Sequence, residues 1–376
     1  MKKKFFRAIC IAIALVMLAA ALSGCGGNQS SAPPPAGGNV PPPDSPPADN
    51  RTWDYTVSFS HAEVVSEYWA RVFGPDIEAK TNGRIKTTIH WAGSLLAVPE
   101  VPRGLQSNVA HIANMPTPNY IDVLPLNCRI LQLPFIGLQD PIVTANIYMQ
   151  LLDEFPEMQQ ELADMGIKVL GATPLGRYDL KLSDKSRSVR LPEDLQGRQI
   201  VPYKLEFIPM LDKYNASASY VPPAQVYETL ERGVIEGYIA TWAYAGFFGL
   251  TELVNQHVDF GDYGAFQELN LMAMSISAWN DLPADMQQAL LDVCWYDGGY
   301  EEIWYGDTDK LANAQRDLAA AKGDLVNVLT PEEMDVWKAY VVPLYQETID
   351  DINSIRGDDA AQRIYDRLLE LLAAVS

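Results

Sequence analysis

Residues 55–91 read YTVSFSHAEVVSEYWARVFGPDIEAKTNGRIKTTIHW, and this stretch decides the fold class. Alternating apolar residues predict one strand over Tyr55–Ser60 and a second over Arg84–Trp91, which follows the turn Asn82-Gly83. Between them, apolar residues at helical spacing predict a helix over Glu63–Lys80. A strand, a helix and another strand in this order are typical of a parallel or mixed sheet covered by helices, so the sequence predicts an α/β architecture.

The same alternation continues along the chain. A helical stretch is predicted over Thr144–Met165, and from Ala284 onward the pattern is mostly helical. Within that helical part there is a break at Lys322–Thr330, after which Thr330-Pro331-Glu332-Glu333 begins a new helix. Further strands are predicted at Ala110–Met115, Ile167–Ala172, Arg198–Val201, Ser219–Val221, Ile235–Ala240 and Leu269–Ala278.

The N-terminus has the pattern of an export signal. Four basic residues precede an apolar run over Ala8–Leu22, which is too short to cross a bilayer as a helix. The run ends in Leu22-Ser23-Gly24-Cys25, which resembles a bacterial lipobox, where cleavage before Cys25 leaves its thiol to carry a lipid. We therefore expect residues 1–24 to be a lipoprotein signal peptide and Cys25 to be lipidated. The alternative is an ordinary signal peptide with a chance cysteine.

The segment after Cys25 is predicted to be a tether. Gly26–Asn50 is rich in Pro, Gly, Ser and Asn, a composition that cannot bury a core. At ~3.1 Å per residue, it would reach at most about 75 Å. We expect residues 25–50 to anchor a folded domain, residues 51–376, to the outer face of a bacterial membrane. The sequence does not say which membrane.

Composition limits the possible partners. The chain of 376 residues has 28 Lys and Arg against 48 Asp and Glu, a net charge of −20, which argues against nucleic acid as a partner. Its length leaves room for two core-bearing units. Besides Cys10 in the leader and Cys25, only Cys128 and Cys294 remain, and these either form one disulfide or are two separate buried thiols.

Five segments carry a family resemblance through their joint order, and Val226–Leu230 followed by Gly233–Gly237 is the most specific part. They are TNGRIKTTIHWAGSL (81–95), LQLPFIGLQDP (131–141), LPEDLQGRQIVPY (191–203), VPPAQVYETLERGVIEGYIA (221–240) and SAWNDLPADMQQALLDV (277–293). From about Tyr55 to Val293 the chain resembles the solute-binding proteins of TRAP transporters, the tripartite ATP-independent periplasmic uptake systems.

The resemblance implies a two-lobed periplasmic-binding-protein-like fold with mixed sheets, a hinge and long C-terminal helices. Lobe I would comprise residues 51–174 and 260–300, and lobe II residues 175–259 and the C-terminal helices. The protein would bind one small organic solute in the cleft between the lobes and deliver it, as a monomer without cofactor, to the permease subunits in the membrane. Closure would be driven by the ligand's higher affinity for the closed form.

The resemblance also locates a possible anion site. The family's usual anchor is an arginine that grips a carboxylate, and its position falls here on Val201. Arg177 matches a second basic position that supports the ligand in the family. Either Arg177 and Lys204 hold the anion from different directions, or the ligand is not a simple carboxylate. Alternatively, Arg177 pairs with an acid such as Asp179.

Several aromatic residues lie near another position where the resemblance implies a ligand contact. The family's polar ligand contact falls on Ala240, which lies between Tyr238 and Trp242, and Tyr203 follows the Val201 strand. Aromatic faces suit an aromatic ligand or a quaternary ammonium group. We therefore expect Tyr203, Tyr238 and Trp242 to line the cleft, with core packing as the alternative.

Two further residues end predicted strands. His61 and Asn114 correspond to ligand contacts in some relatives, and the alternatives are a surface or capping histidine and a turn-forming asparagine. We find no metal-ligand spacing and no nucleophile or nucleotide motif, so no metal, cofactor or enzymatic activity is predicted. The functional alternatives are a receptor that presents its ligand to a sensor protein and, less consistent with the motifs, an exported hydrolase.

Overall fold

The structure is a computed structural model that describes residues 51–60, 73–136, 140–202, 207–219, 221, 225–261, 264–296 and 300–375. The predicted signal peptide, Cys25 and the tether lie outside the described residues, as do His61, Tyr203, Lys204 and most of the predicted helix Glu63–Lys80.

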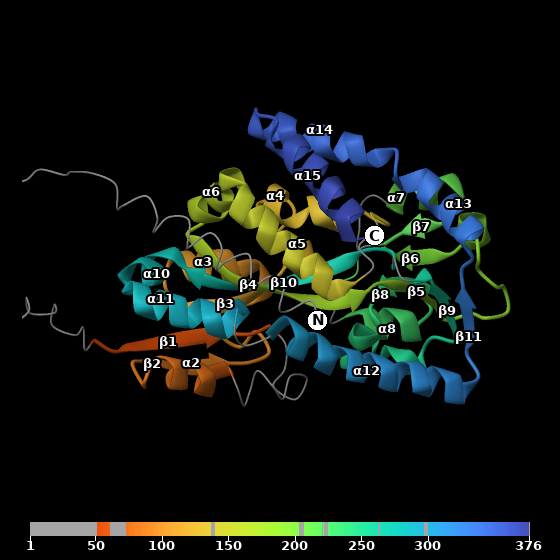
Figure 1. Cartoon of the computed structure of the whole chain (residues 1–376). Helices are drawn as coiled ribbons and strands as arrows, with labels where there is room; N and C mark the ends of the chain where they lie inside the picture. The colour runs from red at the N-terminus through yellow and green to blue at the C-terminus, as the bar shows by residue number, and fades with distance from the viewer. Residues whose placement is uncertain are drawn as a thin grey trace, which may run out of the picture. The chain divides into compact units, whose positions relative to one another are not determined.

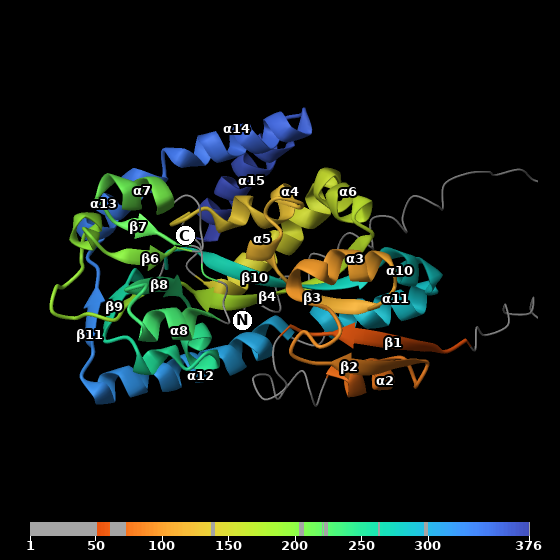
Figure 2. The ribbon, with the colours of Figure 1, turned by 180° about the vertical axis from the view of Figure 1, so that it is seen from behind.

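Two mixed β-sheets form the framework (Figures 1 and 2). The first sheet has five strands in the order β2 (Ile85–His90), β1 (Trp53–Ser58), β3 (Ile112–Pro116), β10 (Gln267–Ser275) and β4 (Ile167–Arg177). The second sheet has six, in the order β11 (Leu325–Val328), β9 (Gln256–Asp259), β5 (Asp179–Leu182), β8 (Gly237–Ala240), β6 (Gln199–Val201) and β7 (Ser217–Ala218). Both contain parallel and antiparallel pairs, so the predicted α/β class with mixed sheets is confirmed.

The opening stretch folds as its pattern predicts where it is described. In β1, Trp53, Tyr55 and Val57 are buried and Asp54 is exposed, because successive side chains of a strand point to opposite faces. The strand runs parallel to β2 in the register Trp53↔Ile85. The turn before β2 has positive φ at Asn82 and Gly83, which residues of these two types adopt most readily.

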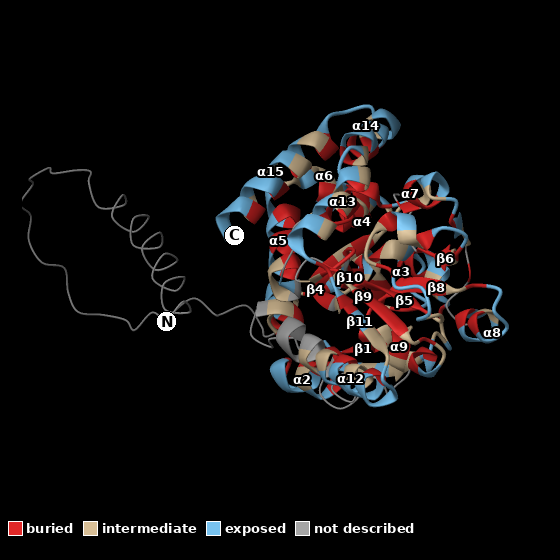
Figure 3. Cartoon of the chain, turned by 90° about the vertical axis from the view of Figure 1, so that its right-hand side faces the viewer, coloured by how far each residue is buried: buried red, intermediate tan, exposed pale blue. Residues whose placement is uncertain are grey.

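Helices cover the sheets, and their exposed faces lie on the outside (Figure 3). The helices are α2 (Gly74–Lys80), α3 (Val101–Gln106), α4 (Pro125–Cys128), α5 (Pro141–Glu154), α6 (Pro156–Asp164), α7 (Ile208–Lys213), α8 (Val226–Glu231), α9 (Trp242–Phe247), α10 (Ile276–Asp281), α11 (Ala284–Leu291), α12 (Tyr300–Lys322), α13 (Pro331–Val341), α14 (Leu344–Arg356) and α15 (Ala360–Val375).

Several boundaries differ from the predictions. The single helix expected over Thr144–Met165 is two helices, because Phe155 is extended and Pro156, which lacks an amide proton, begins α6. The strand expected over Leu269–Ala278 ends at Ser275, and its last apolar residues begin α10. Short apolar runs of this kind do not distinguish a strand from a helix.

Each sheet is packed in its own hydrophobic core. The first core lies between the first sheet and α5, and it includes Ile349 of α14 and Leu368 of α15. The second core surrounds the second sheet and includes Trp337 of α13. We expected all C-terminal helices to belong with the second lobe, but the apolar faces of α14 and α15 pack in the first core, where α14 contacts α15 and α15 contacts α5. α12 lies on the opposite side of the strands from α14 and α15 (Figures 1 and 2).

The chain crosses between the sheets at hydrogen-bonded segments. Tyr178 alone separates β4 of the first sheet from β5 of the second. Its N–H donates to the carbonyl of Phe266 at 3.2 Å, and its carbonyl accepts from Ala265 at 2.6 Å. Phe135 donates to the carbonyl of Ala265 at 3.0 Å, which adds a third segment. The three segments form a narrow connection between the two cores.

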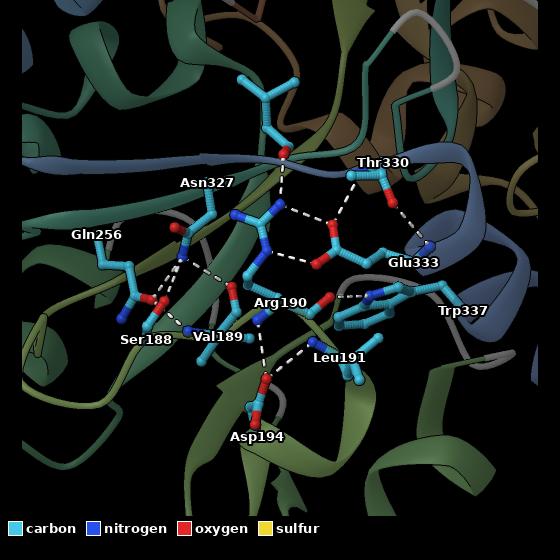
Figure 4. A network of polar contacts seen from close by, with 11 residues as sticks. Ser188, Val189, Arg190, Leu191, Asp194, Gln256, Asn327, Thr330, Glu333 and Trp337 are labelled. Atoms are coloured by element: carbon cyan, nitrogen blue, oxygen red, sulfur yellow. Dashed lines mark hydrogen bonds and ion pairs between the residues drawn. The ribbon is translucent and has the colours of Figure 1, made fainter.

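A polar network fixes the second lobe (Figure 4). The Arg190 guanidinium binds both carboxylate oxygens of Glu333 and the carbonyl of Val328. Glu333 also completes a capping box with Thr330, so the predicted start of α13 is confirmed. The indole of Trp337 donates to the carbonyl of Arg190 at 2.8 Å. The network therefore ties the segment before β6 to α13.

Cys128 and Cys294 are both free and buried, Cys128 in the first core and Cys294 in a third cluster around β1. The structure thus has two separate thiols rather than a disulfide. Among the described helices, none combines the length and apolarity that a membrane crossing requires.

Candidate functional site

A pocket opens where the end of β4, the start of α9 and the middle of α12 meet. It contains about 300 Å³ of empty space, a volume that includes the open solvent at its mouth. Its lining is Gly176, Arg177, Thr241, Trp242, Ala243, Thr308, Asp309, Ala312 and Arg316. The first five residues belong to the region where the sequence predicted ligand contacts, and the last four come from α12.

The end of β4 presents Arg177. The residue immediately before Arg177 is Gly176, whose φ of 95° is a conformation that favours glycine. Gly264 lies against Arg177, since a Cβ at this glycine would be 2.8 Å from the Arg177 Cβ. Arg177 is also paired with Gln267 of β10 in the antiparallel ladder. The arginine is thus placed by a strand end and by a close approach that only glycine permits.

The start of α9 presents Thr241 and Trp242. The Thr241 hydroxyl caps the helix by accepting a hydrogen bond from the Tyr244 N–H at 2.9 Å. Trp242 is 4% exposed, and its ring already has three neighbours. The Lys181 Nζ lies 4.2 Å from the ring centroid, and the Arg316 guanidinium lies 5.7 Å from it. The His257 ring packs at 4.3 Å. Cation–π contacts within the protein therefore occupy much of this indole.

A buried charged pair lies behind the indole. Lys181 is fully buried, and its Nζ is 3.9 Å from the Asp179 carboxylate, too far for a hydrogen bond. Burial lowers the pKa of Lys181 and raises that of Asp179, and the attraction between the two charges opposes both shifts. Arg316 and Arg177 are close enough to oppose the rise in the pKa of Asp179 as well. The two pocket arginines thus act on the same carboxylate.

His257 completes the layer behind Trp242. Its Nε2 is 3.1 Å from the Asp324 carboxylate, while burial and the nearby Lys181 lower its pKa to about 4. Asp324 favours the charged ring but does not overcome these effects. His257 is therefore neutral at physiological pH. In the described part of the chain, no group of three His, Cys, Asp or Glu residues is placed to hold a metal ion.

α12 contributes a row of polar side chains to the pocket. The Arg316 Nη1 donates to Asn313 Oδ1 at 2.9 Å, and Asn313 Nδ2 donates to Asp309 at 3.0 Å. Spacings of three and four residues put these groups on one helix face. The smaller Thr308 and Ala312 are buried beside them and leave space for the pocket.

The structure brings together two of the residues proposed from the sequence, Arg177 and Trp242. Val201, Tyr238 and Ala240 lie instead in the second core, each at most 1% exposed, and they do not line this pocket. Val201 and Tyr238 face each other across the β6–β8 pair, so their burial follows from sheet packing. Arg198 does not supply the missing anchor, because it is fully buried and donates to the carbonyl of Arg187.

Asn114 has a local structural role in the first sheet. Its carbonyl oxygen accepts from the Ser60 N–H at 2.7 Å, and its amide donates to the Ser60 hydroxyl and to Asn270. These bonds connect the end of β1 to β3 and β10. Asn114 is thus buried and bonded within the first sheet, and it is not among the residues that line the pocket, so its role as a ligand contact stays a prediction.

The α12 residues of the pocket were missed by sequence reasoning. They lie on an otherwise polar helix about 130 positions after Arg177, and no motif marks them. Thr241 has a local signal, because a threonine before a helical stretch is a common N-cap.

Comparison with known proteins places this site in a family context. The family sequence model "DctP: Bacterial extracellular solute-binding protein, family 7" matches residues 60–351. A protein from Chromohalobacter salexigens, named "Solute-binding protein", is 22% identical over 282 residues, which cover 74% of this chain and 79% of that protein.

Solved structures share the two-lobed fold. A marine metagenome TRAP solute-binding protein specific for aromatic acid ligands, in complex with metahydroxyphenylacetate, has a TM-score of 0.73 at 20% identity, covering 85% of this chain and 98% of that one. A TRAP solute-binding protein from Rhodoferax ferrireducens with copurified benzoate has a TM-score of 0.72 at 17% identity, with the same coverage. A Bordetella pertussis receptor binding pyroglutamic acid has a TM-score of 0.67 at 20% identity, covering 84% and 99%.

Proposed function

The chain belongs to the bacterial extracellular solute-binding proteins of family 7, and on that premise we propose that it binds a small organic acid in the pocket between β4, α9 and α12. The single observation that carries the proposal is the convergence of Arg177, Thr241 and Trp242 on one open pocket. Arg177 offers a planar fork of donors to a carboxylate, and Thr241 offers a hydroxyl.

The ligands of similar proteins support this class. Benzoate, pyroglutamic acid and metahydroxyphenylacetate, which three structurally similar receptors hold, all carry a carboxylate. An arginine at the pocket suits this shared group, because its guanidinium can donate two parallel hydrogen bonds to a carboxylate. With Val201 in the core, we assign the anchoring role to Arg177. Tyr203, Lys204 and His61 remain proposed contacts that lie outside the described residues.

We infer the wider organisation from the sequence pattern together with the family. We assign residues 1–24 to a lipoprotein signal peptide and residues 25–50 to a lipidated tether, so that Cys25 holds the two-lobed domain at a membrane surface. The receptor delivers its solute, chemically unaltered, to TRAP permease subunits. Lobe I comprises residues 51–174 and 260–300, and lobe II residues 175–259, while α13 joins lobe II and the packing of α14 and α15 joins them to lobe I.

A thermal-shift screen of the purified protein against organic acids, sulfonates, amines and neutral sugars tests the proposal. A ligand at 100 times its Kd stabilises the folded chain by about 2.7 kcal/mol. We expect carboxylates to stabilise it, and calorimetry on Arg177→Gln to show a loss of about 1.5–3 kcal/mol of binding free energy. Arg232→Gln is the matched control, since the Arg232 side chain is 69% exposed at the C-terminal end of α8 and does not line the pocket.

The screen has two outcomes that refute the proposal. Stabilisation by amines or neutral sugars but by no carboxylate would show that the ligand is not an organic acid. Equal acid affinity for wild type and Arg177→Gln would remove Arg177 from the site. Mass spectrometry after prolonged incubation should recover each acid intact.

A further inference from the structure

We propose that Arg316 of α12 is a second anion-binding residue of the pocket, and that Asp309 restricts the ligand to acids that also carry a hydrogen-bond donor. This inference rests on the proposed function of the same pocket. It names two specificity residues on a helix that no sequence motif marks, and it narrows the ligand class from organic acids to acids with a hydroxyl or N–H group.

The first argument is the donor capacity of Arg316. A guanidinium has five N–H donors, and in the described part of the chain that of Arg316 makes one hydrogen bond, to Asn313 at 2.9 Å. The side chain is half-buried and lines the pocket. Asn313 and the nearby Trp242 ring hold it in place, so little side-chain entropy remains to be lost when a ligand binds.

The second argument is the local charge. Arg177 and Arg316 line the pocket together with one acidic residue, Asp309, so the lining carries a formal charge of +1 in a chain of net charge −20. Behind Trp242, Lys181 and Asp179 form a buried pair that adds no net charge when both groups are ionised. Two guanidiniums on different elements can bind the two oxygens of one carboxylate from different directions. Arg316 thus takes over the charge that the family places at position 201, where this chain has valine.

The third argument concerns Asp309. Its carboxylate accepts a hydrogen bond from Asn313 at 3.0 Å, which orients it on the pocket side of α12. A carboxylate accepts several hydrogen bonds. When a ligand displaces water from this pocket, an acid with a hydroxyl or N–H group can replace the lost water as a donor to Asp309, whereas an acid without a donor leaves the carboxylate with the Asn313 amide as its donor. A site built this way discriminates strongly between such ligands.

Isothermal titration calorimetry on the purified protein tests both roles with three probes. Pyroglutamate carries a carboxylate and a lactam N–H, D-glucuronate carries a carboxylate and hydroxyls, and benzoate carries a carboxylate without another donor. We expect Arg316→Gln to weaken whichever acids bind by about 10- to 100-fold. Arg316→Lys should recover part of that loss, because it restores the charge but not the fork.

The second variant separates the two roles. Asp309→Asn should weaken pyroglutamate or glucuronate by about 10-fold and leave benzoate unchanged or tighter. Lys310→Gln is the matched control, because it removes one positive charge from the exposed neighbouring position of α12 without touching the pocket lining. Urea unfolding of each variant checks that the fold is intact, and a variant that fails this check is replaced by Arg316→Met or Asp309→Ser.

The outcomes distinguish this inference from the proposed function. Acid binding that is unchanged in Arg316→Gln but lost in Arg177→Gln overturns the role of Arg316 alone. Benzoate binding that falls as much as pyroglutamate binding in Asp309→Asn overturns the donor requirement. Wild-type protein that binds none of the three probes, nor any other carboxylate of the thermal-shift screen, overturns both the proposed function and this inference.

Discussion

Glu268 offers the sharpest test of the electrostatics of this fold. It lies in β10, two residues after Phe266, where the chain crosses between the sheets. Its carboxyl group is 6% exposed and accepts a hydrogen bond from the Tyr178 hydroxyl. The Tyr178 ring is stacked on Phe266 with centroids 4.1 Å apart, which excludes water. Burial raises the pKa of Glu268 to about 8.

The consequence for stability has a definite sign. In the unfolded chain the carboxyl titrates near its ordinary value of 4.5, so between about pH 4.5 and 8 the folded state holds a proton that the unfolded state has lost. The stabilisation is complete below pH 4.5 and is lost as the pH rises to 8. One pKa unit corresponds to about 1.4 kcal/mol, so the contribution falls by roughly 2 kcal/mol between pH 6 and 8.

Glu268→Gln removes this dependence because the amide stays neutral and still accepts from Tyr178. Urea unfolding of both proteins, measured by fluorescence at half-unit steps from pH 6 to 8, should show the variant gaining about 2 kcal/mol over wild type. The other titrating groups cancel in the difference. Glu231→Gln, an exposed glutamate on α8, is the control for the substitution itself. Parallel curves for wild type and Glu268→Gln would show that the carboxyl is ionised in the folded state.

Three further expectations concern other buried groups. Burial lowers the pKa of His257 to about 4, so NMR should show the ring in its neutral form throughout the range from pH 7 to 5.5. A titration midpoint near pH 6.5 would contradict this effect of burial. Glu333→Ala removes the Glu333 half of the capping box of α13 and the pair with Arg190, and should cost about 1–2 kcal/mol in urea unfolding, whereas no change would show that the network adds nothing. Cys128 and Cys294 should resist alkylation in the native protein and both react after unfolding, as peptide mass spectrometry can check, while a disulfide would leave both unreactive.

The strands that sequence reasoning located have apolar residues at regular spacing. β1, β2, β3 and β4 were predicted for this reason, and the capping box at Thr330 located the start of α13. β5, β7, β9 and β11 were missed, since the strand expected over Ser219–Val221 begins only after β7 ends at Ala218. β5 and β9 are four residues long and carry buried polar side chains, such as Lys181 and His257, at positions where a pattern search expects apolar ones. Tertiary contacts, namely the Trp242 ring beside Lys181 and the Asp324 carboxylate beside His257, make this burial possible.

The residues of the pocket could also be predicted only in part from the sequence. Arg177 and Trp242 could be proposed because each lies beside a strand that the sequence identifies. The contribution of α12 could not, because only the packing of this helix against α9 brings its residues to the pocket. Val201, Tyr238 and Ala240 are in the strands that were predicted, but alternation along a strand does not say which of two buried faces meets a cleft.

The role of Trp242 changes once its neighbours are known. The sequence presented it as an aromatic face for a ligand, yet Lys181, His257 and Arg316 already contact the ring. Removing the indole would leave the Lys181 ammonium with only a carboxylate 3.9 Å away in a buried position, which is costly. A Trp242→Ala variant that lost ligand affinity would therefore not by itself identify a stacking contact. Only a variant that keeps the folding stability and still loses affinity would do so, and Trp242→Phe, which retains an aromatic face over Lys181, is the substitution that separates these two roles.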